Sequence, residues 1–256
     1  MNRPVDWRES LDRAVRMLQA AETLCVLTGA GVSAESGIPT FRGSDGLWEG
    51  HPIEDVASPR GWQKNPQRVW NFYHTRRANV ARTKPNPGHE ALVRMERRWG
   101  ERFTLITQNV DGLHRAAGSR NLIEIHGSLR RTRCLQCGDV ADRGLEELEG
   151  IPECPECGGI LRPDIVWFGE MLPPQLWRAS ETAVQNCDVM LVVGTSAVVY
   201  PVAGLIPLAR TTKSSGQCGQ VIECNLTETE ASSMVDLGLY GPSGQILPAL
   251  CEQLGI

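Results

Sequence analysis

The chain has 256 residues, a formal net charge of −4 and a hydrophobic content of 41%. At about 150 residues per domain, this length indicates one large domain with a smaller appendage, or two small domains. The composition is ordinary for a globular protein and argues against disorder, collagen and coiled coil. The acidic balance argues against a mainly electrostatic binder of membranes or nucleic acids, so we expect no direct nucleic-acid role.

The sequence carries no signal for export or for a membrane span. Residues 1–22 contain four acidic residues and no apolar core, unlike a signal or transit peptide. No window approaches 18 uninterrupted apolar residues. The nine cysteines cannot all pair within one chain, and unpaired thiols in apolar runs are typical of a reducing compartment. We therefore expect a cytoplasmic protein, and a monomer. The cysteines outside any motif are Cys25, Cys187, Cys218, Cys224 and Cys251.

The predicted elements alternate between helices and strands along the chain. Apolar residues at three- and four-residue spacing predict an amphipathic helix at about 7–18. Short apolar runs without polar alternation predict strands that are buried on both faces, as in a parallel sheet. These runs are 24–28, 103–107, 122–125, 165–168, 189–193 and 221–224. Helices are expected at about 66–82, 88–99, 174–186, 201–210 and 245–254. The alternation predicts an α/β fold with a Rossmann-like, doubly wound parallel sheet.

Residues 129–163 differ from the rest of the chain, with proline, glycine, acidic residues and few apolar ones. They contain Cys134, Cys137, Cys154 and Cys157, in two CxxC pairs with 16 residues between them. Four thiolates in this spacing match a closed, structural Zn²⁺ site. A redox dithiol is the alternative, but both pairs lie in Gly/Pro-rich turns and neither opens a helix. We expect a small zinc-ribbon-like domain at 129–163 and a Rossmann-like domain at 1–128 and 164–256, with a helical segment at about 50–100.

A glycine-rich loop follows the first predicted strand. Gly29, Gly31 and Ala34 match GxGxxA, in which small residues let the backbone approach a pyrophosphate near a helix N-terminus. A tight turn without a ligand has the same local pattern. A dehydrogenase would continue with a helix, a second strand and an acid about 20 residues on. Here Pro39 disfavours a long helix after the loop, and no second strand precedes residue 49. We therefore expect a dinucleotide site covered by a long, functional loop.

Polar residues follow two further predicted strands. Asn109 and Asp111 come after 103–107, where open α/β sheets bind ligands, although an Asx turn has the same signature. His126 comes after 122–125, and a neutral imidazole there can act as a general base. A strand-end histidine that bonds to the backbone is the alternative.

Five ordered motifs resemble the sirtuins, which are NAD-dependent protein lysine deacylases. They are GAGVSAESGIPTFRG at 29–43, TQNVDGLH at 107–114, EIHG at 124–127, GTS at 194–196, and Asn225. The resemblance implies a Rossmann-like domain with a small zinc module, NAD across the carboxyl ends of the strands, and acyl-lysine entering between the domains. It also implies that the acyl oxygen attacks C1′ of the nicotinamide ribose and that a histidine then assists a ribose hydroxyl. The products would be free lysine, nicotinamide and O-acyl-ADP-ribose.

The resemblance also implies roles for individual residues. His126 would be the base, Asn109 would order water and ribose near C1′, and Asp111 would accept from the nicotinamide carboxamide. Phe41 would shield C1′ and Arg42 would lie beside the phosphates. Ser243 lies in a loop expected at the adenine end, where an ordinary β-turn explains the sequence equally well. The remaining expected cofactor contacts are Gly29, Ala30, Gly31, Ser33, Ala34, Glu35, Ile38, Pro39, Thr40, Trp48, Gln108, Val110, Gly194, Thr195, Ser196, Asn225, Leu226 and Thr227.

The acyl group is indicated by Tyr73 and Arg76. On a helix they share a face, and a phenol beside a guanidinium can receive a carboxylate. A surface Tyr–Arg stack is the alternative. This pair resembles the class III sirtuins, which remove succinyl, malonyl or glutaryl groups. We therefore expect desuccinylation and demalonylation, with deacetylation second. The other expected substrate contacts are Val166, Trp167, Phe168, Gly169 and Glu170.

The expected partners are acylated lysine side chains of proteins. The peptide would add a strand between the domains, along 166–169 and 197–200. Three other functions stay open: a protein that is mainly a deacetylase, a mono-ADP-ribosyltransferase, and an NAD-sensing or zinc-ribbon binding module without turnover. The His126 motif and the Tyr73–Arg76 pair favour deacylation.

Overall fold

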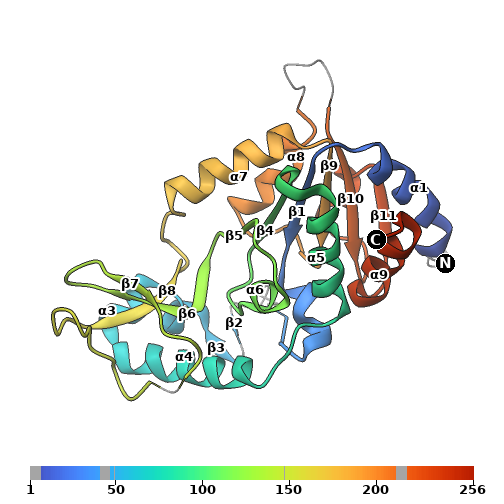
Figure 1. The fold of residues 1–256 in the computed structure, drawn as a ribbon. Coiled ribbons are helices and arrows are strands. Elements are labelled where there is room, and N and C mark those ends of the chain that lie inside the picture. The colour runs from blue at the N-terminus through green and yellow to red at the C-terminus, as the bar shows by residue number, and fades with distance from the viewer. Residues whose placement is uncertain (1–6, 41–46, 49, 147, 212–217) are drawn as a thin grey trace.

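The computed structural model describes residues 7–40, 47–48, 50–146, 148–211 and 218–256. A six-stranded sheet, parallel throughout, dominates these residues (Figure 1). The predicted Rossmann-like α/β class is therefore confirmed. Across the sheet the strand order is β11-β10-β9-β1-β4-β5. The strands are β1 (Leu24–Thr28), β4 (Phe103–Thr107), β5 (Leu122–Glu124), β9 (Val189–Val193), β10 (Gln220–Asn225) and β11 (Leu237–Tyr240).

The order of connection reverses beside β1, in the middle of the sheet. The chain builds β1, β4 and β5 in one direction and then returns to add β9, β10 and β11 on the other side of β1. Thr28, the last residue of β1, pairs with Thr107 of β4 and Val193 of β9. The three central strands thus end at the same level. In open α/β sheets, a ligand crevice forms beyond the strand ends at such a reversal.

Helices cover both faces of the sheet because the strands are apolar on both sides. All five residues of β1 are buried. Leu24 and Val26 face one core, while Cys25 and Leu27 face the other. The first core contains α1 (Trp7–Ala20), α5 (Pro87–Trp99) and α9 (Ser243–Leu254), and the second contains α7 (Pro174–Asn186) and α8 (Leu205–Leu208).

A smaller antiparallel sheet lies to one side of the large one (Figure 1). Its order is β7-β6-β8, with β6 at Gly127–Cys134, β7 at Val140–Asp142 and β8 at Leu161–Ile165. A third apolar core joins it to the helical segment, and within it Trp70 Nε1 donates to the Leu161 carbonyl at 2.9 Å. The small sheet therefore uses helices from residues 53–81 to complete its core. These helices are α2 (Ile53–Val56), α3 (Pro59–Lys64) and α4 (Pro66–Ala81).

Three sequence predictions of elements need correction. The strand predicted at 165–168 is wrong, because the strand is Leu161–Ile165 and belongs to the small sheet. After β8 the chain leaves the sheet, and Trp167 packs in the third core at 2% exposure, whereas Phe168 is 44% exposed. The short strand β11 was not predicted, since Gly238 interrupts its apolar pattern. The helix expected at 201–210 is a 3₁₀ turn, Val202–Gly204, followed by the four-residue α8.

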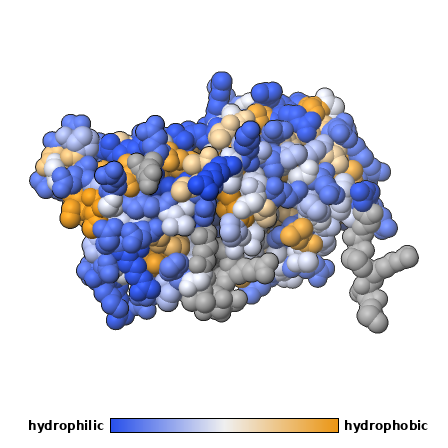
Figure 2. All heavy atoms as spheres, turned by 90° about the horizontal axis from the view of Figure 1, so that it is seen from below, coloured by the Kyte–Doolittle hydropathy of each residue, from blue (hydrophilic) through white to orange (hydrophobic). Residues whose placement is uncertain are grey.

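Short elements complete the described chain. No helix in the described ranges has the length and apolar character that crossing a membrane requires. Figure 2, a view from below, shows a mostly hydrophilic face with hydrophobic residues in small separate groups. The short elements are η1 (Ala30–Ser36), β2 (Leu47–Trp48), β3 (His51–Pro52), η3 (Gly100–Arg102), α6 (Leu113–Ala117) and η5 (Glu230–Met234).

Two glycine loops touch at the carboxyl edge of the sheet. The Gly31 N–H donates to the Gly194 carbonyl at 2.7 Å, and Gly194 has a φ of +59°. A Cβ on Gly194 would lie 2.4 Å from the backbone nitrogen of Val32, and it would require a left-handed conformation that favours glycine.

Replacement of Gly194 should therefore destabilise the fold even without any ligand. We expect Gly194→Ala to lower the free energy of unfolding by at least about 1–3 kcal/mol, measured by urea denaturation. Gly204→Ala is the matched control, because a Cβ there meets nothing within 4 Å. Equal stability of the two variants would contradict this account of the loop contact.

Candidate functional site

A cavity of about 700 Å³ lies beyond the carboxyl ends of the central strands, between the large sheet and the small module. Most residues expected at the cofactor and substrate sites line it. They are Gly29, Ala30, Gly31, Ile38, Pro39, Thr40, Trp48, Arg76, Gln108, Asn109, Val110, Asp111, His126, Val166, Trp167, Phe168, Gly169, Glu170, Gly194, Thr195, Ser196, Asn225, Leu226 and Thr227.

Other expected residues lie elsewhere. Phe41 and Arg42 are outside the described residues. Five more are described but do not line the cavity: Ser33, Ala34, Glu35, Tyr73 and Ser243. Among these, Ser243 and Glu35 meet each other, since Glu35 Oε1 accepts from the Gly244 N–H at 2.7 Å and from Ser243 Oγ at 3.3 Å. Their contact fastens the start of α9 to η1.

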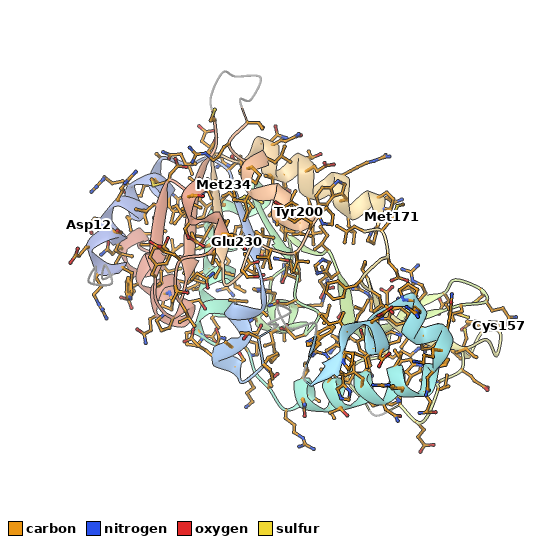
Figure 3. All side chains as sticks on the ribbon, turned by 180° about the vertical axis from the view of Figure 1, so that it is seen from behind. Asp12, Cys157, Met171, Tyr200, Glu230 and Met234 are labelled. Carbon is orange, nitrogen blue, oxygen red and sulfur yellow. The ribbon has the colours of Figure 1, made fainter. Side chains whose placement is uncertain are left out.

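The cavity is also lined by residues that were not among the expected cofactor and substrate contacts. Glu228, Thr229 and Glu230 follow Asn225 beyond the end of β10, so the strand-end rule could have found them. Val198 and Tyr200 fall in the segment expected to pair with a peptide. Figure 3 shows Tyr200 and Glu230 on the side of the large sheet, with Cys157 at the far end of the small module. The remaining additions are Ala57, Ile165, Leu172, Val199 and Pro201.

His126 lies in the turn that joins β5 of the large sheet to β6 of the small one. Its Nδ1 is 3.1 Å from the Gln108 carbonyl oxygen, which can only accept, so Nδ1 carries the proton and Nε2 keeps a lone pair. Burial lowers the pKa of His126, and the hydrogen bond to Gln108 partly opposes this shift. The side chain thus bonds to the backbone and still offers a neutral, basic nitrogen.

Gly127 fixes the backbone beside this histidine. It has a φ of +86°, and a Cβ on it would lie 2.0 Å from the Asp164 carbonyl oxygen. The His126 carbonyl accepts from the Val166 N–H at 2.9 Å. The histidine is therefore held where the two sheets meet, next to the segment that follows β8.

A buried polar cluster forms one wall of the cavity. Asp111 Oδ2 accepts from Ser33 Oγ at 2.8 Å, and its Oδ1 accepts from the Leu113 N–H at 2.8 Å. Asn109 Nδ2 donates to the Gly29 carbonyl at 3.0 Å and to Ser33 Oγ at 3.2 Å. Burial raises the pKa of Asp111, and these hydrogen bonds oppose it. Asp111 therefore makes the Asx turn and also places a buried acceptor at the strand end.

Two further histidines lie close behind this cluster. The rings of His89 and His114 are 4.8 Å apart, and His114 Nε2 is 2.9 Å from Thr28 Oγ1. Burial lowers the pKa of His89 to about 4 and that of His114 well below its usual value. Both rings are thus neutral, and they pack against each other beside β1.

Tyr73 and Arg76 are both buried on α4, so the alternative of a surface stack is wrong. Arg76 is 7% exposed and lines the cavity, with its guanidinium 4.2 Å from the centre of the Trp48 ring. Tyr73 is fully buried, and its hydroxyl oxygen accepts from Trp167 Nε1 at 2.9 Å. Burial raises the pKa of Tyr73 to about 12, so the phenol stays protonated. The pair therefore combines a cation at the cavity wall with a neutral phenol behind it.

Glu223 on β10 is a buried carboxylate that the sequence analysis did not single out. Its Oε2 accepts from Ser232 Oγ at 2.5 Å and Tyr240 Oη at 3.1 Å, while Thr229 Oγ1 donates to its Oε1. These hydroxyls attach the loop after β10 to the sheet. The sequence does show Glu223 as a single acidic residue inside an apolar run. Such a residue needs hydrogen-bond partners when it is buried, so this pattern could have pointed to it.

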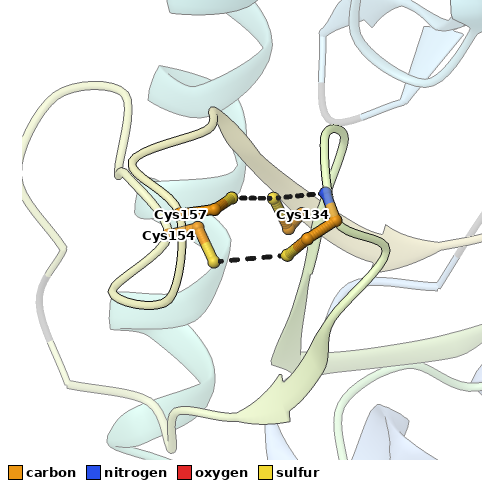
Figure 4. A group of neighbouring side chains, drawn as sticks. Cys134, Cys154 and Cys157 are labelled. Atoms are coloured by element: carbon orange, nitrogen blue, oxygen red, sulfur yellow. Dashed lines mark hydrogen bonds between the residues drawn. The ribbon is translucent and has the colours of Figure 1, made fainter.

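The four cysteines form a compact cluster at the outer end of the small module (Figure 4). Their Sγ atoms lie within 4.8 Å of one another, with Cys134–Cys157 at 3.5 Å and Cys137–Cys154 at 3.8 Å. A tetrahedron with Zn–S bonds of about 2.3 Å has edges of about 3.8 Å, so these residues fit zinc. Backbone N–H groups of Cys137 and Gln136 lower the pKa of Cys134 to about 6, which favours its thiolate.

Both pairs use the same local fold. The Gly138 N–H donates to the Cys134 carbonyl, and the Gly158 N–H donates to the Cys154 carbonyl. Both glycines have positive φ, at +78° and +71°. Four protein ligands fill a tetrahedral metal, so this site is structural and leaves no position for a substrate.

The sequence model of the Sir2 family matches residues 29–201. The chain belongs to this family. It is 45% identical to NAD-dependent protein deacylase 2 of Pyrobaculum aerophilum, over 93% of each chain. It is 41% identical to the mitochondrial NAD-dependent protein deacylase sirtuin-5 of Canis lupus familiaris, over 91% of this chain and 82% of that protein. A crystal structure of a Sir2 homologue in complex with NAD superimposes with a TM-score of 0.86 at 42% identity, covering 95% of this Sir2 chain and 93% of the other.

The histidine environment predicts a measurable titration. Because burial disfavours the imidazolium, His126 should titrate below the value of about 6.5 of an ordinary histidine. NMR titration of its ring proton, assigned by comparison with His126→Gln, measures this pKa. The urea-unfolded chain gives the reference, and a folded-state value at or above that reference would contradict the geometry.

The cysteine cluster predicts one zinc per chain. Loss of a residue that only hydrogen-bonds to a metal ligand typically weakens metal binding about 10–100-fold. Cys137→Ser removes a ligand itself, so it should weaken zinc binding by more than this and lower the melting temperature. Cys218→Ser is the control, since Cys218 is exposed and outside the cluster. Metal content is measured by mass spectrometry. Retention of stoichiometric, chelator-resistant zinc in Cys137→Ser would refute the four-ligand site.

Proposed function

We propose that this Sir2 protein removes succinyl or malonyl groups from lysine side chains of proteins, with deacetylation as a second activity. In general terms it is an NAD-dependent protein deacylase, as its family and its similarity to proteins of that name indicate. The observation that carries the acyl preference is the guanidinium of Arg76, which lines the cavity although it is only 7% exposed.

The cavity suits a dinucleotide. Its volume of about 700 Å³ is in the range of cofactor sites, and the glycine loops leave backbone free of side chains at the strand ends. When bound, NAD would supply a ribose carbon that releases nicotinamide and hydroxyls that take up the acyl group. Asp111 would accept from the carboxamide, and Asn109 would orient groups near that carbon. These assignments rest on the buried polar wall and on the family resemblance.

His126 supplies the base. Its Nε2 carries a lone pair, because Nδ1 is committed to the Gln108 carbonyl. A neutral imidazole can take a proton from a hydroxyl within hydrogen-bond distance, and its low pKa keeps it neutral at physiological pH. Proton removal by His126 is thus the step that this chain performs on the bound ribose.

Arg76 distinguishes acyl groups by charge. A guanidinium binds a carboxylate through paired hydrogen bonds, which are stronger in a water-poor cavity than in bulk solvent. Succinyl and malonyl groups end in a carboxylate, whereas an acetyl group ends in a methyl group. The buried cation therefore gains an ionic partner from the first two only.

We further infer that the substrate peptide lies along residues 166–169 and 197–200 as an added strand. Both segments contribute to the cavity wall, and Phe168 and Tyr200 are 44% and 76% exposed. Backbone pairing of this kind selects little for sequence. The acyl-lysine itself would then be the main recognised feature.

Arg76→Met tests the acyl preference. We expect kcat/KM for succinyl-lysine peptide to fall about 10–100-fold through loss of charged hydrogen bonds, with the acetyl-lysine value changed less than about threefold. Arg82→Met, at the exposed end of the same helix, is the control. An unchanged ratio between the two peptides in Arg76→Met would overturn the proposal.

The general reaction is tested with NAD and matched succinyl-, malonyl- and acetyl-lysine peptides. Mass spectrometry should show free lysine peptide and O-acyl-ADP-ribose in equal amounts. Nicotinamide release without deacylated peptide would refute deacylation, and ADP-ribose on the protein or peptide would point to mono-ADP-ribosyl transfer.

A further inference from the structure

We propose that Arg162, clamped by Glu170, is a positioning residue for acyl specificity: it fixes Trp167 and, through the indole, the hydroxyl of Tyr73. The inference rests on the proposed preference for acyl groups that end in a carboxylate. It adds a residue that lies outside the cavity wall and that neither the sequence motifs nor the cavity itself points out.

Arg162 lies on β8 and uses its guanidinium within the protein. Nη1 and Nη2 donate to the two carboxylate oxygens of Glu170 at 2.6 and 3.0 Å. Nη2 also donates to the Ile165 carbonyl at 2.8 Å, and Nε to the Pro163 carbonyl at 3.3 Å. The side chain is 12% exposed. With these bonds directed at its own chain, Arg162 acts on a substrate only through a neighbour.

That neighbour is Trp167. The guanidinium carbon of Arg162 lies 3.4 Å from the centre of the Trp167 ring, a close stacked contact. Glu170 Oε2 accepts from the Trp167 backbone N–H at 2.9 Å, so one carboxylate holds both the guanidinium and the tryptophan backbone. Trp62 packs against the same indole at 5.7 Å between centroids. These contacts select one orientation of an indole that lines the cavity.

The indole orientation sets the hydrogen-bonding role of the Tyr73 hydroxyl. An indole N–H can only donate, so the Tyr73 oxygen is the acceptor in their 2.9 Å hydrogen bond. The phenol hydrogen then remains for another acceptor, and a carboxylate is one. Arg76 lies one turn further along α4 and interacts electrostatically with Tyr73. If the indole turned away, the hydroxyl hydrogen could rotate into the direction that the indole N–H now occupies, and it would no longer be held for a carboxylate.

This arrangement makes Arg162→Lys a discriminating variant. Lysine keeps the positive charge beside Glu170 but lacks the planar group that stacks on the indole and the paired donors that match the carboxylate. A defect in that variant therefore reports on geometry and not on net charge.

The test compares kcat and KM for succinyl- and acetyl-lysine peptides of one sequence. We expect Arg162→Lys to lower kcat/KM for the succinyl peptide about tenfold, mainly through KM, with the acetyl value within about twofold. In a Tyr73→Phe background, Arg162→Lys should change the ratio no further, because the phenol it acts through is absent.

Arg133→Lys is the matched control. Arg133 lies on the neighbouring strand β6, is paired with Asp164 at 2.8 Å and is half-exposed, so its replacement should leave the acyl ratio unchanged. Melting temperature and zinc content check that each variant is folded. Parallel loss for both peptides, an unchanged ratio, or an additive effect with Tyr73→Phe would overturn the proposal.

The wild-type protein in the same assay separates this inference from the proposed function. If the wild-type protein favours the acetyl peptide, the proposed acyl preference fails. Even in that case the clamp is supported if Arg162→Lys changes the ratio of succinyl to acetyl kcat/KM in the wild-type background and leaves it unchanged in the Tyr73→Phe background. A ratio that Arg162→Lys does not move refutes the clamp, whichever peptide the wild-type protein prefers.

Discussion

The site depends on one backbone contact, the approach of Gly31 to Gly194 where the strand order of the sheet reverses. A 2.7 Å hydrogen bond joins these residues, and a side chain on either would overlap the other loop. The contact brings the loop after β1 against the loop after β9, and together they form the floor of the cavity. The glycines thus serve the fold as well as the approach of a phosphate. A cofactor site at this edge follows from how the two halves of the sheet meet.

The junction between the two sheets places His126 at the cavity. The chain leaves the large sheet at β5 and enters the small one at Gly127, with His126 in the turn between them. After β8 it returns past the same point, where the Val166 N–H bonds to the His126 carbonyl. His126 and Val166 are therefore neighbours, although 39 residues lie between them in the chain. The cluster of four cysteines lies within this intervening segment and joins the turn after β6 to the turn before β8.

Burial decides which groups in and behind the cavity carry charge. It keeps the imidazoles of His126 and His89 and the phenol of Tyr73 neutral, because their charged forms are poorly solvated there. The guanidinium of Arg76 stays cationic, since arginine keeps its proton in proteins. A neutral imidazole, a neutral hydroxyl and a fixed cation thus stand in and behind the cavity wall, which is the combination that the proposed preference for a carboxylated acyl group uses. The same burial requires partners for Glu223 and Arg162, and these partners hold two of the cavity's walls.

The sequence by itself determined the fold class, the family and the four metal-ligating cysteines. These depend on local patterns: unbroken apolar runs, glycine loops after strands, and CxxC spacing. Only the tertiary structure decided what distant residues do together. Residues 165–168 have the apolar pattern of a sheet strand, yet only Ile165 belongs to one, since Trp167 packs in the third core and Phe168 is 44% exposed. An apolar run does not show whether its residues are buried within a sheet or against other side chains. The roles of Arg162 and Glu223 also came only from the fold, since a single charged residue in a strand shows no partner until the chain is packed around it.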